Sequence, residues 1–135
     1  MIYRRQICVL VSIAAVAAAA NAHADEGSTK KKGGGASYLQ IDTLTATVLR
    51  DTGQRGVLTV EGGIDVPDLK LRARAALSLP RLRAAYVQRL QIYVAGLAPG
   101  APPDPDYISR TLQTETDRVL GAPGAKLLLG AILIN

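Results

Sequence analysis

The chain has 135 residues, which suits one domain, and a formal net charge of +5. Five of its cations are Arg4, Arg5 and the run Lys30–Lys32, so the remainder is close to neutral and the basic balance does not indicate nucleic-acid binding. Five tyrosines are spread along a chain without tryptophan or phenylalanine, which argues against an aromatic platform for stacking bases or sugars.

Residues 1–24 have the pattern of a cleaved secretory signal peptide. A short basic start precedes 14 uncharged, mostly apolar residues from Ile7 to Ala20. A membrane-spanning helix needs about 20 apolar residues, so this run is short for a span and suits a secretory leader. The small residues Ala22 and Ala24 then form the pattern that a signal peptidase recognises. This pattern predicts cleavage between Ala24 and Asp25. We therefore expect a periplasmic protein.

Two features of residues 1–24 fit more than one form of export. An uncleaved anchor through residues 7–24 would hold the chain at the inner membrane, with the remainder on the same far side. The pair Arg4-Arg5 is a partial match to a twin-arginine signal, and an ordinary basic start looks much the same.

Cleavage would remove Cys8 and His23, the only cysteine and the only histidine. The exported part would then lack a thiol nucleophile, an imidazole base and the ligands that zinc and copper favour. The two acidic pairs do not replace them: Asp104/Asp106 suits helix capping, and Glu115/Asp117 lies on different helix faces. We expect no enzyme, cofactor, metal or small-molecule substrate.

Residues 25–36 contain no large apolar group and three consecutive lysines, which predicts a flexible tether between the leader and a domain at 37–135. The domain begins with two predicted strands. In residues 38–50 the apolar phase slips by one between Ile41 and Leu44, which predicts a β-bulge near Asp42-Thr43. A glycine-containing turn leads to residues 57–66, where Gly62-Gly63 indicates a bulge or a close backbone approach. Together the two segments predict an antiparallel hairpin.

Residues 69–77 fit two structures. Their apolar and basic residues alternate as in a strand, whereas their alanine, leucine and arginine content favours a helix. Ser78 and Pro80 are expected to restart or kink the chain before a helix over 79–95.

A second helix is predicted to start at Asp104-Pro105 and to end near Gly121. The last segment, 126–135, is apolar in both phases, which is typical of a central strand covered on both sides. The predicted fold class is a small α+β domain of order β-β-α-α-β with two or three helices.

This ordered set resembles the periplasmic domain of the FliL family, the flagellar basal-body-associated proteins. The similar segments are Tyr38-Leu39-Gln40-Ile41-Asp42, the glycine-linked strand 58–65, Leu79-Pro80-Arg81-Leu82-Arg83 and the terminal strand 127–135. The resemblance implies a non-enzymatic protein that stabilises or regulates the flagellar stator through ring-forming domains. A cleaved leader departs from the family, whose members keep a transmembrane helix, and implies a soluble exported relative.

Two functions from different classes follow. In the first, the chain is an accessory protein that binds periplasmic proteins, with the flagellar stator or basal body as partner class, self-association as one mechanism, and a basic rim on the second helix segment. The residues of that candidate rim are Arg81, Arg83 and Arg89. In the second, the chain binds a cell-wall or anionic lipid ligand. Its basic residues would be Lys30–Lys32, Lys70, Arg72 and Arg74, and the last three share one side only if 69–77 is a strand.

Overall fold

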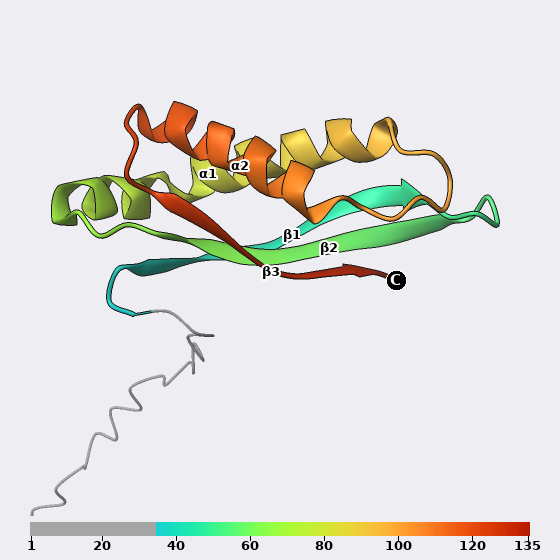
Figure 1. The fold of residues 1–135 in the computed structure, drawn as a ribbon, viewed down its shortest axis with the longest axis horizontal. Helices are drawn as coiled ribbons and strands as arrows, with labels where there is room; N and C mark the ends of the chain where they lie inside the picture. Colours follow the sequence, from blue (N-terminus) through green and yellow to red (C-terminus); the bar gives the residue numbers. More distant parts are fainter. Residues whose placement is uncertain (1–34) are drawn as a thin grey trace, which may run out of the picture. The chain divides into compact units, whose positions relative to one another are not determined.

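The computed structural model describes residues 35–135 and contains three strands and two helices in the order β1-β2-α1-α2-β3. The strands are β1 (Tyr38–Leu49), β2 (Arg55–Asp65) and β3 (Lys126–Ile134), and the helices are α1 (Leu69–Ala95) and α2 (Pro105–Leu120). Both pairings are antiparallel and the sheet order is β1-β2-β3 (Figure 1). The predicted α+β class and element order are confirmed. The leader, its cleavage residues and the lysine-rich tether up to residue 34 lie outside the described residues.

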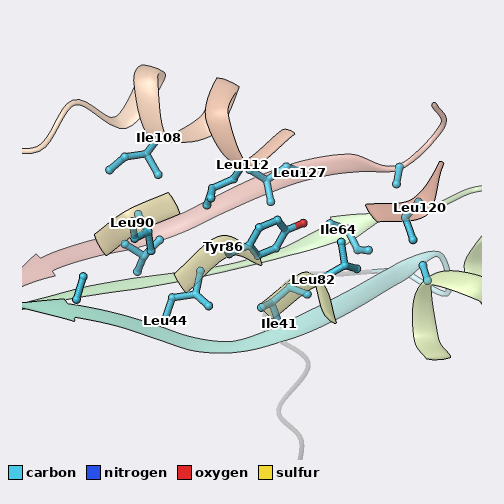
Figure 2. Packing of buried hydrophobic residues seen from close by; sticks show 14 of the residues in the cluster. Ile41, Leu44, Ile64, Leu82, Tyr86, Leu90, Ile108, Leu112, Leu120 and Leu127 are labelled. Atoms are coloured by element: carbon cyan, nitrogen blue, oxygen red, sulfur yellow. The ribbon is translucent and has the colours of Figure 1, made fainter. Parts of the chain in front are cut away.

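Both helices lie against the same face of the sheet (Figure 1). The strands show the matching alternation where they are regular, because every second residue is buried from Leu44 to Val48 of β1 and from Gly56 to Val60 of β2. Figure 2 shows the side chains between the layers, with Tyr86 of α1 pointing into the centre. Within residues 35–135, neither helix is long and apolar enough to cross a membrane.

The hairpin contains the bulge that the sequence predicts. The β1–β2 register shifts between Ile41 and Leu44, so both of these side chains are buried on the helix side. The turn that joins the strands uses Gly53 at a φ of +78°, a conformation that glycine adopts without strain.

Gly62 and Gly63 lie both at a β-bulge and at a close backbone approach, the two alternatives that the sequence indicated. The β2–β3 register shifts between Val60 and Gly62, and a Cβ at Gly62 would lie 2.7 Å from the Leu128 carbonyl oxygen. A Cβ at Gly63 would overlap the ring of Tyr38. The glycines therefore allow β3 and the Tyr38 ring to approach β2 closely.

Helix α1 is continuous over 27 residues, so 69–77 is helical and the expected restart near Ser78 does not occur. Asp68 caps the helix by accepting a hydrogen bond from the Leu71 amide at 2.8 Å. Pro80 sits in the helix interior, where it cannot donate to the Ala76 carbonyl. Pro80 and Ala76 both lie on the exposed side of α1, so water can hydrate that carbonyl and the helix continues.

Helix α2 begins and ends as predicted. The Asp104 carboxylate accepts hydrogen bonds from the amides of Asp106 and Tyr107, and Pro105 occupies the first turn. Gly121 ends the helix in the left-handed conformation.

The prediction that the C-terminal segment is a central strand is wrong. Strand β2 is central and β3 lies at an edge, paired with β2 alone. Of the residues in β3 only Leu127 is buried, whereas Leu133 and Ile134 are 53% and 42% exposed. An apolar run has no periodicity that separates a doubly covered strand from an edge strand with one uncovered face.

Candidate functional site

The three arginines of the candidate rim lie on α1 but do not share a face. Six residues of helix turn through about 600°, so Arg83 and Arg89 point about 120° apart. The Arg83 guanidinium donates to the Thr43 carbonyl at 3.4 Å, on the β1 side, and Arg89 pairs with Glu115 of α2 at 2.7 Å. Arg81 is exposed. Two of the three arginines are therefore engaged within the chain.

Glu115 is a buried carboxylate held between two arginines. Its Oε1 accepts from Arg89 Nε at 2.7 Å and its Oε2 from Arg118 Nε at 2.9 Å. The hydrogen bonds from Arg118 and then Arg89 lower the pKa of Glu115 below its usual value, against the opposing effect of burial. This group ties α1 to α2, which gives Glu115 a structural role that its sequence context did not indicate.

The basic residues at the start of α1 do not form the stripe that a strand would have given. The Arg72 side chain donates to the Val66 and Pro67 carbonyls, both at 2.9 Å, and Arg74 reaches the Leu120 carbonyl at 3.1 Å. Both arginines thus bind backbone groups of the chain itself, just before α1 and at the C-terminal end of α2. Because 69–77 is helical, Lys70, Arg72 and Arg74 do not share one side, and the cationic stripe proposed for an anionic ligand does not form.

Two tyrosines that are far apart in the sequence meet in the fold, contrary to the expectation of scattered aromatics. The rings of Tyr93 and Tyr107 stack with centroids 4.9 Å apart. The Tyr93 hydroxyl also accepts a hydrogen bond from the Asp104 amide at 2.8 Å. The pair joins the end of α1 to the start of α2 and so holds the connecting loop.

No group of three or more histidine, cysteine, aspartate or glutamate side chains suitable for a metal ion occurs in the part of the chain that the structure describes. Large apolar side chains are exposed on α1, at Leu69, Leu77 and Ile92, and on the sheet. Two surfaces of the sheet combine such side chains with unpaired strand geometry.

The face of the sheet turned away from the helices is the first of these surfaces, and we call it the open face. Thr47 of β1 pairs with Val57 of β2, and Thr59 of β2 pairs with Leu133 of β3, so these residues lie side by side on it. Leu49, Val57 and Leu133 are 47%, 45% and 53% exposed. Leucine and valine among threonines make this end of the open face largely apolar, with Arg55, the cross-strand partner of Leu49, as its charged residue.

The free edge of β3 is the second surface, and one side chain closes its first part. The Gln113 amide of α2 donates to the Ala125 carbonyl and accepts from the Leu127 amide, both at 2.8 Å. These are the two bonds that a neighbouring strand would make, so Gln113 takes the place of one peptide unit. No sequence pattern indicates this contact, because glutamine is a common residue on helix surfaces.

A groove of about 470 Å³ lies beside the last part of β3, on the helix side of the sheet. Its lining is mostly apolar and includes Val48, Leu97, Pro102, Ile132 and Ile134. Arg50 and Asp51 contribute charge at the hairpin end. The groove explains why Ile134, although it points to the helix side, remains exposed.

The chain matches no family model, no curated protein and no solved structure in the three comparisons made.

Proposed function

We propose that the chain is a non-enzymatic periplasmic accessory protein that acts by binding other proteins through the open face of its sheet. The observation that carries the proposal is that both helices cover one face and leave Leu49, Val57 and Leu133 of the other face in water. Antiparallel sheets often have one solvated face, but that face is then polar. An apolar end on such a face is typical of a protein-binding surface.

The resemblance to the FliL family supplies the partner class for this proposal. It rests on the ordered segments of residues 38–135 and points to the flagellar stator or basal body. The export pattern of residues 1–24 agrees with a periplasmic location. The charges of the described residues favour protein binding over an anionic lipid or cell-wall ligand, because Arg72 and Arg74 bind carbonyls of the chain itself.

Swimming in soft agar tests the proposal. A strain that lacks the gene is expected to swim poorly, and the wild-type chain is expected to restore swimming. Val57→Asp places a charge at the apolar end of the open face and is expected to abolish this complementation without unfolding the chain, since Val57 is 45% exposed. Gln88→Asp, on the exposed side of α1, is the matched control and is expected to complement. Normal swimming of the deletion strain would overturn the flagellar role, and complementation by both variants would overturn the open face as the binding surface.

A further inference from the structure

We propose that the last part of β3 is a self-association site, where a second copy of this chain adds its own β3 in antiparallel orientation about a two-fold axis at Leu133. The two sheets then form one six-stranded sheet, and, where the proposed function holds, the two open faces form one continuous binding surface. The argument uses backbone geometry, charge and register.

The backbone of the last residues of β3 is available for pairing. Val57 and Asn135 exchange two hydrogen bonds, with N···O distances of 2.9 and 3.0 Å. In an antiparallel ladder, bonded and non-bonded pairs alternate. The N–H and C=O groups of Ile132 and Ile134 therefore point away from β2, to the free edge. Among residues 35–135 no loop or cap hydrogen bond reaches them.

Gln113 limits where a second strand can bind. Because its amide already occupies the Ala125 carbonyl and the Leu127 amide, an added strand can pair only beyond Leu127. The bulge opposite Glu61, at Gly130-Ala131, interrupts the edge once more. Ile132 and Ile134 are left as the regular part of the edge.

This part of β3 lacks the features by which proteins protect an edge. Natural edge strands carry lysine, proline or inward-pointing charges. Residues 127–134 contain no charge and no proline, and Lys126 stands at the start, next to the part that Gln113 closes. A neutral apolar strand fits an equally neutral apolar strand, and a second copy supplies one.

The register about Leu133 uses every available backbone group. Ile132 of one copy faces Ile134 of the other, and the reverse pair forms on the other side of the axis, which gives four hydrogen bonds from two complete pairs. Leu133 faces its own counterpart as a non-bonded pair on the open face, where Cβ atoms lie about 5 Å apart. The isoleucines meet on the other side, next to the groove. An isologous contact of this kind closes after two chains.

The contact is small. About five residues of each chain take part, which places the interface below the roughly 1,200 Å² of standard stable complexes. We therefore expect a dimer that forms and dissociates with concentration.

Charge substitutions at the axis provide the test. The chain, purified as the cell exports it, is studied by sedimentation equilibrium over a hundredfold range of concentration. Wild type is expected to pass from monomer to dimer. Leu133→Lys and Leu133→Glu are each expected to weaken dimerisation at least tenfold, because like charges face each other, and an equimolar mixture of the two is expected to restore a mixed dimer. Val57→Lys, on the same face but one strand from the axis, is the control and is expected to dimerise as wild type does.

A proline provides a second test that does not depend on charge. Ile134→Pro removes an N–H that points to the free edge and leaves the bonds to β2 in place, whereas Ile134→Ala removes a similar amount of side chain and keeps the N–H. Both variants lose the Ile134 side chain at the contact, so we expect dimerisation to be weaker for the proline variant than for the alanine variant.

A monomeric wild type, a mixture that stays monomeric, or equal behaviour of the proline and alanine variants would each overturn the β3 site. These results are independent of the swimming assay. A monomeric Leu133→Lys chain that still complements would leave the proposed function standing and remove the dimer from it.

Discussion

The two edges of the sheet differ in how far groups of the chain itself bind their outward-facing backbone atoms. At the β1 edge, the chain's own groups reach the strand: Gly100 donates to the Leu49 carbonyl at 3.0 Å, and Arg83 to the Thr43 carbonyl at 3.4 Å. At the β3 edge, the Gln113 amide closes only the start. The side chains differ in the same sense, since the last half of β1 alternates with threonines and the last half of β3 is apolar throughout. Groups of the chain thus reach β1 at its bulge and at its hairpin end, whereas on β3 they reach only the start of the strand.

The largest expected effect comes from moving β3 off the sheet. Gly62→Ala places a Cβ 2.7 Å from the Leu128 carbonyl oxygen, and a backbone atom cannot turn aside. We expect a loss of about 2–3 kcal/mol in the free energy of unfolding, measured by urea denaturation. Gly130→Ala, whose nearest contact is 3.3 Å, is the control across the same bulge and should lose less. Equal losses would contradict the close approach at Gly62.

The next effect concerns the helix layer above both edges. Glu115→Ala removes the carboxylate between Arg89 and Arg118, and because both arginines are about half exposed they can be hydrated after the change. We expect a loss of about 1–3 kcal/mol in the free energy of unfolding, with Arg110→Ala, exposed on the same helix, as a near-neutral control.

The pH dependence of stability follows from the same carboxylate. The arginines lower the pKa of Glu115 in the folded state below its ordinary value of 4.5, so its contribution is full above that value. The contribution is lost as the pH falls through the folded pKa. The stability difference between wild type and Glu115→Gln is therefore expected to shrink on acidification below pH 4.5 in denaturation curves. A difference that is constant from neutral to strongly acid pH would contradict the ion pair.

A smaller effect tests the closure of β3 directly. Gln113→Ala leaves the Ala125 carbonyl and the Leu127 amide without their partner, and we expect about 1 kcal/mol of destabilisation. The edge amide of Leu127 should also exchange with deuterium faster, while amides that bond to β2 change little. Unchanged exchange at Leu127 would show that Gln113 does not close the edge. Gln88→Ala on the exposed side of α1 is the control.

The smallest effect is at the β1 edge. Arg83→Ala removes a long hydrogen bond at a hydrated carbonyl, and we expect less than about 0.5 kcal/mol by thermal unfolding. A large loss would mean that Arg83 holds the bulge of β1 in place.

The features of the fold that the sequence predicted depend on residues close together in the chain. The bulge between Ile41 and Leu44 showed as a phase slip, and the ends of α2 showed as Asp104-Pro105 and Gly121. The position of β3 in the sheet did not show, because strand order depends on pairing between distant segments. Helix was predicted for 79–95 and was one of two structures open for 69–77, but the uninterrupted helix through Pro80 was not predicted, since its continuation depends on Ala76 facing water.

The candidate site was harder to predict for the same reason. The contacts that tie Gln113 to Ala125 and Glu115 to Arg89 span 12 and 26 positions, and neither residue type is unusual on a helix. The stacked pair of Tyr93 and Tyr107 comes together only when the loop folds. The arginines at 83 and 89 were visible, but their internal partners were not.

Gly100 links these observations to how the protein behaves at high concentration. Its φ of +76° and the 2.7 Å that would separate a Cβ there from the Asp51 Cβ leave room for no side chain, so the loop can bring its amide to the Leu49 carbonyl. A strand from another molecule that approached β1 at its hairpin end would have to displace this amide from the Leu49 carbonyl. One glycine in a proline-rich loop thereby limits the growth of the sheet at that end of β1.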